Sequence, residues 1–282
     1  MKKRIDLQEA KQLIEQMRHD RGFPSGYSEL DKLSGGLVRD GVTLIAARPA
    51  MGKTSLALNL INRISQQRNG TILIYTPNIH SDEITIRLLC IGTNLSAPDF
   101  LNNKLPSDAL GKRISHYFAE KKANIELDID SFLSLDDIWD RSFRFPDLQL
   151  IVINSIEEIY EPIDFSADII NWDVPKVPRE ETLRSLQKLA RTLNVPVLCT
   201  TNLHRSLEKR KNKRPHLGDL KKIGIPTDVA DQIIFLYRDR YYDPEGEEGA
   251  ELIIGKSVRG DTGTVNLDWD YTTGLLTERE TE

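Results

Sequence analysis

The eight residues Ala47-Arg48-Pro49-Ala50-Met51-Gly52-Lys53-Thr54 decide the fold of this chain. They follow a short apolar run, Val42 to Ala46, and precede an amphipathic run that begins at Ser55. A turn between a strand and a helix directs backbone N–H groups and a helix N-terminus at a phosphate. Lys53 adds a positive charge, and the hydroxyl of Thr54 suits the magnesium ion that accompanies the β and γ phosphates. The stretch therefore predicts a phosphate-binding loop.

Most of the specificity of this motif lies in Gly52-Lys53-Thr54, because Ala47 stands where the usual pattern has its first glycine. The alternative is a chance triplet, which the flanking strand and helix patterns disfavour. We predict that the loop binds ATP with Mg²⁺ and that Thr54 is a ligand of the metal. The predicted nucleotide-binding residues are Arg48, Pro49, Ala50, Met51, Gly52, Lys53, Thr54 and Ser55.

The composition is that of a soluble protein, with 29% charged and 39% hydrophobic residues in 282. No apolar run approaches the length of about 18 residues that a membrane span needs. The first residues are basic but no apolar segment follows them, so we expect a cytoplasmic protein without a signal peptide. Cys90 and Cys199 lie in apolar segments, which favours buried thiols over a disulfide or a metal site. The net charge of −5 means that any nucleic-acid contact must come from a local basic patch.

Hydrophobic periodicity predicts strands that first alternate with helices and then follow one another as hairpins. This order indicates an α/β fold whose mainly parallel central sheet is flanked by helices and carries antiparallel hairpins at one edge. The run at 179–193 leads into a strand and predicts a βαβ crossover. The predicted strands cover residues 42–46, 71–75, 150–154, 195–200, 232–237, 251–256 and 264–269, and the predicted helices cover 55–67, 82–92, 107–120 and 179–193.

The first twenty residues form a predicted helix that is separate from the P-loop domain of residues 21–282. Glycine, proline and serine at 22–26 break the helical pattern, so the helix packs either on its own domain or on a neighbouring subunit. Residues 161–178 contain three prolines and predict a mobile loop. The apolar stripe of the N-terminal helix consists of Leu7, Ala10, Leu13, Ile14 and Met17.

Several sequence blocks, taken in order, resemble the motor domain of DnaB-type replicative helicases, which has a RecA-like fold. The resemblance covers about residues 21–270. It implies an ATP-binding protein of DNA replication that acts on single-stranded DNA in a hexameric ring, with residues 5–18 as a linker helix that packs on the next subunit. We expect no counterpart of the family's separate N-terminal domain. The blocks lie at residues 26–37, 46–54, 205–208, 213–215, 219–220, 237–239, 253–256 and 263–265.

The chain departs from the family at three catalytic positions, each of which has an asparagine. Asn78 stands where the family has the glutamate that activates the attacking water, and Asn154 where a carboxylate orders the magnesium shell. Asn202 replaces a glutamine that senses the γ-phosphate. An amide cannot act as a general base, so no residue is assigned as catalytic. The neighbouring Glu157 and Glu158 are candidate replacements, with solvated loop carboxylates as the alternative; His80 and His204 are a further possibility.

The arginine of the family that reaches a neighbour's nucleotide corresponds to Val258 here. Lys256 and Arg259 are therefore the candidates for action on the nucleotide of an adjacent subunit. A shift of one residue along a strand turns the side chain to the opposite face, so Arg259 can substitute only if the hairpin is bulged.

Lys221, Lys222 and Gly224 match the family's loop that lines the central channel and contacts single-stranded DNA. Two lysines there would attract phosphates without reading the base sequence. The alternative is an ordinary solvated loop. A further group of basic residues occupies positions 205–214.

Three functions are consistent with the sequence. The first is a motor domain that binds ATP and single-stranded DNA but hydrolyses ATP weakly or not at all. The second is an active ATP-dependent replicative helicase in which neighbouring residues replace the lost groups. The third is a non-enzymatic adaptor that contacts a replicative helicase through residues 7–17. The expected partners are single-stranded DNA and either further copies of this chain in a ring or a helicase.

Overall fold

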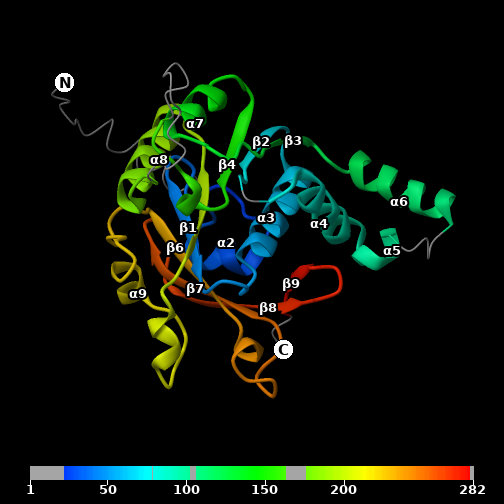
Figure 1. Ribbon diagram of the computed structural model, residues 1–282. Coiled ribbons are helices and arrows are strands. Elements are labelled where there is room, and N and C mark those ends of the chain that lie inside the picture. Colours follow the sequence, from blue (N-terminus) through cyan, green and yellow to red (C-terminus); the bar gives the residue numbers. More distant parts are fainter. Residues whose placement is uncertain (1–21, 78, 102–105, 163–175, 280–282) are drawn as a thin grey trace, which may run out of the picture.

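The computed structural model describes residues 22–77, 79–101, 106–162 and 176–279 (Figure 1). The predicted N-terminal helix, Asn78 and most of the predicted loop at 161–178 lie outside these residues. One nine-stranded sheet runs through the described part of the chain, in the order β3-β2-β4-β5-β1-β6-β7-β8-β9. The strands are β1 Val42–Ala47, β2 Gly70–Tyr75, β3 Ala123–Asp128, β4 Leu148–Ile153, β5 Val197–Asn202, β6 Gln232–Tyr237, β7 Ala250–Ser257, β8 Gly263–Trp269 and β9 Leu276–Glu278.

The first six strands of this sheet order, β3-β2-β4-β5-β1-β6, are parallel. Strands β7, β8 and β9 extend the sheet with antiparallel pairs. The predicted architecture is therefore confirmed. The central strands β1 and β6 are buried along their whole length, because helices cover both faces of the sheet. The carboxyl ends of β4, β5 and β1 meet at one edge, which is where ligands bind in open parallel sheets.

Helices cover the sheet on both sides, with α3 and α4 on one side and α7 and α8 on the other (Figure 1). Apolar residues of α3 join one buried cluster, and those of α8 join the second cluster on the opposite face. The α-helices are α2 Ser28–Ser34, α3 Lys53–Gln67, α4 Ser81–Thr93, α5 Ala97–Leu101, α6 Ser107–Ala119, α7 Leu135–Ser142, α8 Arg179–Leu193 and α9 Leu217–Lys221; the 3-10 helices are η1 Ile156–Glu158, η2 Arg205–Lys209 and η3 Asp239–Tyr241.

The predicted strands and helices agree with the structure to within two residues at each end. Helix α8 connects the parallel strands β4 and β5, so the predicted crossover is also confirmed. Six elements were not predicted from the sequence: β3, β9, α2, α5, α7 and α9. Strand β3 is an edge strand with few buried positions, and the other missed elements are eight residues or shorter, so the hydrophobic period repeats too few times in them to be recognised. None of the described helices is long and apolar enough to cross a membrane.

Candidate nucleotide-binding site

The predicted phosphate-binding loop connects β1 to α3, as the sequence pattern requires. Gly52 has a φ of 101°, in the left-handed region that favours glycine, and the N–H of Leu56 donates to its carbonyl at 2.9 Å. A Cβ on Gly52 would lie 1.9 Å from the Trp269 ring. Backbone conformation and the packing of Trp269 therefore both require glycine here.

Lys53, the first residue of α3, is buried at the carboxyl edge of the sheet. Its ammonium donates to the carbonyl of Arg48 at 3.2 Å and to Oδ1 of Asn202 at 2.7 Å. Burial lowers the pKa of Lys53 to about 8, and the charge of Arg48 adds to this effect while that of Glu157 opposes it. Both acceptors are neutral, so the positive charge of Lys53 is not cancelled by a contacting carboxylate.

Thr54 and Asn154 lie side by side, although they are 100 residues apart in sequence. Oδ1 of Asn154 accepts from the hydroxyl of Thr54 at 3.3 Å and from the hydroxyl of Thr200 at 2.9 Å. The cluster joins α3 to the ends of β4 and β5 and contains only uncharged oxygens. Within the described ranges, no three His, Cys, Asp or Glu side chains form a group that could hold a metal ion. A magnesium ion here would depend on Thr54, the phosphates and water for its ligands.

The two glutamates that follow β4 have different surroundings. Oε1 of Glu157 accepts from the backbone N–H of Asn202 at 2.6 Å and from the hydroxyl of Thr201 at 2.7 Å. Glu158 instead pairs with Lys176 at 2.8 Å. Of the two predicted replacements, only Glu157 contacts a residue of the candidate site.

Arg48 connects the phosphate-binding loop to the segment that follows β5. Its Nε donates to Oε1 of Glu208 at 2.7 Å, and its Nη1 donates to the carbonyl of Leu203 at 2.7 Å. The side chain of Arg48 is only 17% exposed. These contacts hold the loop against η2, so two sequence blocks that are far apart along the chain meet in the structure.

An aromatic stack beside the loop was missed by the sequence analysis. The rings of Trp269 and Tyr271 are stacked with centroids 5.5 Å apart, and the guanidinium of Arg238 lies 4.5 Å from the Trp269 centroid and 4.7 Å from that of Tyr271. The only signal in the sequence is a tryptophan at the end of a predicted strand. The stack offers a flat surface next to Gly52.

Lys256 and Arg259, the candidates for action on a neighbouring subunit, both bind groups of their own chain. Lys256 donates to the carbonyls of Thr227 at 2.9 Å and Ala230 at 2.6 Å. Arg259 donates to Asp40 at 2.9 Å. The β6–β7 pairing shifts register next to Lys256, ahead of Arg259. Their action on another subunit stays a prediction.

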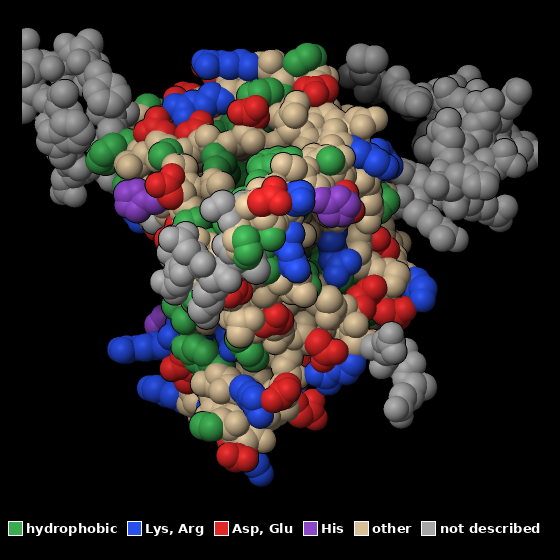
Figure 2. Space-filling model, turned by 90° about the vertical axis from the view of Figure 1, so that its right-hand side faces the viewer, with side chains coloured by type: hydrophobic (Ala, Val, Ile, Leu, Met, Phe, Trp, Pro, Cys, Tyr) green, Lys and Arg blue, Asp and Glu red, His purple; other side chains and the backbone are tan. Residues whose placement is uncertain are grey.

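The predicted DNA-binding residues lie at the end of α9, away from the phosphate-binding loop in sequence. Lys221, Lys222 and Gly224 are exposed, and Gly224 has a φ of 74° with open space around it. Lys222 donates to the buried Asp219 at 3.3 Å. On the face drawn in Figure 2, basic and acidic side chains are interspersed without a continuous basic field, in keeping with the net charge.

The model of the DnaB-like helicase C-terminal domain family matches residues 22–277. The replicative DNA helicase DnaB of Geobacillus stearothermophilus is 32% identical over 262 residues, covering 89% of this chain and 56% of that protein. The replicative DNA helicase DnaC of Bacillus subtilis (strain 168) is 30% identical over 263 residues, covering 90% of this chain and 57% of that protein. The chain thus spans about half the length of these relatives.

Two solved structures resemble this chain over nearly all of its length. An ATPase domain superposes with a TM-score of 0.82 at 28% identity, covering 99% of this chain and 100% of that one. A DnaB-like replicative helicase, described with its interactions with primase, superposes with a TM-score of 0.79 at 28% identity, covering 99% of this chain and 68% of that one. The family match also includes the phosphate-binding loop, β4 and β5.

Proposed function

Because the chain belongs to the DnaB-like helicase C-terminal domain family, we propose that it binds ATP with Mg²⁺ and single-stranded DNA but turns ATP over slowly or not at all. The observation that carries this proposal is the environment of Asn154. Its side chain occupies the position between Thr54 and Thr200 where a magnesium-ordering carboxylate is needed, and it brings no negative charge.

The parts that bind phosphate are all present. Gly52 has the required conformation, Lys53 supplies the charge and Thr54 supplies the hydroxyl. The triphosphate would be held by the loop amides and Lys53, and Mg²⁺ by Thr54, with Asn154 in reach of a metal-bound water. Bound Mg²⁺ would offset the charge of the phosphates. Arg238 and the Trp269 ring are the groups that we expect beside the base.

The positions that would activate the attacking water carry amides in place of carboxylates. The amide of Asn154 accepts hydrogen bonds without attracting a cation strongly, and Asn78 offers an amide where a base is needed. Loss of a general base alone costs about 10²–10⁴-fold in rate. We therefore expect turnover far below the roughly 1–100 s⁻¹ of efficient phosphoryl-transfer enzymes.

A steady-state ATPase assay with and without single-stranded DNA tests the hydrolysis claim, and calorimetry with ATP tests binding. We expect ATP binding that Lys53→Ala removes, with turnover near background. Turnover within the range of efficient enzymes, abolished by Lys53→Ala, would overturn the inactive assignment. Equal ATP affinity in wild type and Lys53→Ala would overturn the site itself.

The alternative of an active motor has one observation in its favour. Glu157 places a carboxylate against Asn202, and its Oε2 is buried with no hydrogen-bond partner in the described part of the chain. A Glu157→Gln variant separates the two functions. It would abolish turnover in an active motor, whereas a weak ATPase would change little.

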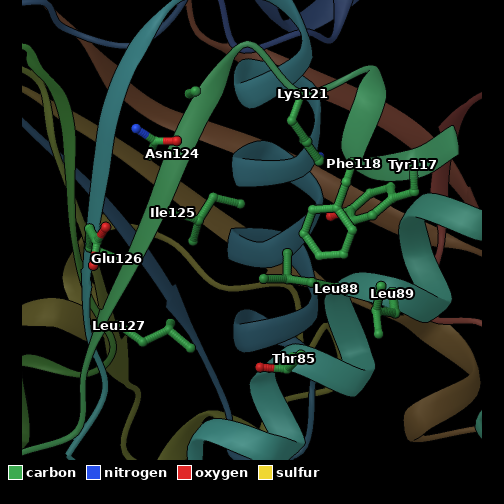
Figure 3. Close-up of a pocket in the computed structure, with 11 residues that line it drawn as sticks. Thr85, Leu88, Leu89, Tyr117, Phe118, Lys121, Asn124, Ile125, Glu126 and Leu127 are labelled. Carbon is green, nitrogen blue, oxygen red and sulfur yellow. The ribbon is translucent and has the colours of Figure 1, made fainter. Parts of the chain in front are cut away.

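For assembly, we propose that residues 5–18 of one copy pack on a groove of another copy. The groove lies between α4, α6 and β3 and has a volume of about 420 Å³ (Figure 3). Leu88, Leu89 and Tyr117 line it, and Phe118 at its edge is 60% exposed. In the adaptor alternative, residues 7–17 would contact a helicase instead of another copy of this chain. The apolar side chains that would pack in this groove come from the N-terminal stripe, which consists of Leu7, Ala10, Leu13, Ile14 and Met17.

A further inference from the structure

A continuous series of polar contacts leads from the phosphate-binding loop to the predicted DNA loop. Lys53 donates to the side chain of Asn202, whose backbone N–H donates to Glu157. Glu157 lies 3.5 Å from Nε of Arg179 at the start of α8. Nη1 of Arg179 donates to the carbonyl of Ile223 at 3.2 Å. Ile223 lies between the two DNA-loop positions 222 and 224, so the series ends inside the loop that we assign to DNA.

The pair in the middle of this series is incompletely bonded. The side chain of Glu157 is 11% exposed and that of Arg179 is 34% exposed. Oε2 of Glu157 and Nε of Arg179 are both buried, and neither has a hydrogen-bond partner among the residues that the structure describes. A buried carboxylate oxygen without a partner is unfavourable, and native proteins usually satisfy such atoms. The free oxygen gives Arg179 a second arrangement, in which two guanidinium N–H groups bind the carboxylate.

We propose that Glu157 and Arg179 are positioning residues that couple the nucleotide pocket to the loop of residues 221–225. When phosphate draws Lys53 away from Asn202, Asn202 is released from one of its contacts and its N–H shifts against Glu157. The carboxylate then turns toward Arg179, and Arg179 exchanges the Ile223 carbonyl for Oε2. Without nucleotide, Arg179 holds the DNA loop through the Ile223 carbonyl, and with nucleotide the loop is released. These are the two states that coupling between the sites requires.

This inference rests on the proposed function, because it assumes that ATP and DNA bind at the two ends of the series. In this proposal Glu157 takes no part in hydrolysis. Its side chain contacts Thr201 and Asn202 on strand β5, and its role is to transmit the state of Asn202 to α8.

The first experiment measures the affinity of a non-hydrolysable ATP analogue with and without saturating oligo-dT. The ratio of the two affinities measures the coupling between the sites. A change in ATP-analogue affinity that a variant shows both with and without DNA cancels in this ratio. We expect a ratio of about 5 or more in the wild type. We expect a ratio near 1 in Glu157→Gln, which keeps an acceptor for Asn202 but loses the charge, and in Arg179→Gln. Arg184→Gln is the matched control, because it removes an exposed α8 ion pair with Glu180 and should keep the wild-type ratio.

The second experiment needs no DNA. Amide hydrogen exchange at Gly224 and Ile225, which donate to Lys221 and Leu220, is followed while the ATP analogue is added. Exchange should change in the wild type and in Arg184→Gln but not in Glu157→Gln. Unaltered ratios in Glu157→Gln and Arg179→Gln, with binding intact, would overturn the coupling and leave the proposed function standing. Failure of the wild type to bind the analogue would instead overturn the proposed function.

Discussion

The ammonium of Lys53 lies 2.7 Å from Oδ1 of Asn202, so the phosphate-binding loop is bonded directly to the carboxyl end of β5. The contact brings together the start of α3 and a strand that lies 149 residues later in the sequence. Arg48 and Asn202 take two of the three ammonium donors, so a phosphate that binds more than one of them must compete with these acceptors. The affinity of the loop for a nucleotide therefore depends on the charge of Lys53 and on its contact with Asn202.

ATP affinity should fall as the pH rises above about 8. The free protein loses the Lys53 proton there because burial lowers its pKa to about 8, whereas phosphates favour the charged form. The logarithm of affinity should fall by up to about one per pH unit, and binding should take up protons. Calorimetry at pH 7, 8 and 9 in buffers of different ionisation enthalpy measures both.

Lys53→Met is the control for this dependence, since it removes the titrating group. Its residual affinity should be weak and nearly independent of pH. A wild-type affinity that stays constant from pH 7 to 9 would show that Lys53 does not titrate in this range.

Restoring the missing charges should raise hydrolysis. Oδ1 of Asn154 already accepts from two hydroxyls, so Asn154→Asp fits the same contacts and adds a charge for the magnesium shell. Combined with Asn78→Glu, it should increase DNA-stimulated ATPase by at least about 10²-fold, the lower bound of a general base's contribution. A phosphate-release assay measures this.

The same double change in a Lys53→Ala background should stay inactive, which excludes a contaminating ATPase. If the double variant is folded and binds ATP but gains nothing, further defects such as the exposed Val258 must limit turnover.

Single-stranded DNA binding should depend on the exposed Lys221 and Lys222. Each phosphate contact that is lost should reduce the slope of log affinity against log salt by about 0.7. The double variant Lys221→Ala with Lys222→Ala should therefore lower the slope by about 1.4 and weaken binding at low salt. Fluorescence anisotropy of labelled oligo-dT at several salt concentrations gives the slope.

Lys112→Ala is the matched control, because Lys112 is an exposed lysine of α6 that pairs with Asp108. It should leave the slope unchanged. Equal slopes in all three proteins would reduce the basic loop to an ordinary solvated surface.

Self-association should require both the first twenty residues and the groove beside α6. A chain that starts at Gly22 should be monomeric by light scattering, because it lacks the apolar stripe. Phe118→Glu should weaken assembly by placing a charge at the exposed edge of the groove. Phe143→Glu alters a similarly exposed phenylalanine outside the groove and should assemble like the wild type.

The groove assignment fails if Phe118→Glu keeps the wild-type mass. An unchanged mass in the chain that starts at Gly22 would remove the role of the N-terminal residues altogether.

Sequence alone predicted the phosphate-binding loop, seven of the nine strands in the described sheet, the parallel order with its antiparallel edge, and the amides at Asn154 and Asn202. These features depend on local composition and on hydrophobic period, which neighbouring residues specify. The motif Gly52-Lys53-Thr54 can be recognised without any tertiary information.

Only the tertiary structure decided which of these residues meet and what holds them. The packing of Trp269 on Gly52, the contact of Arg48 with Glu208 and the difference between Glu157 and Glu158 all join segments that are distant in sequence or turn on the direction of one side chain. The contacts of Arg48 and Glu157 follow from the strand order β4-β5-β1, which places the ends of three separate strands at one edge of the sheet, and that of Trp269 follows from the antiparallel extension through β8. Local periodicity predicts that the strands exist but not which ones are neighbours, and the chemistry of the site depends on those neighbours.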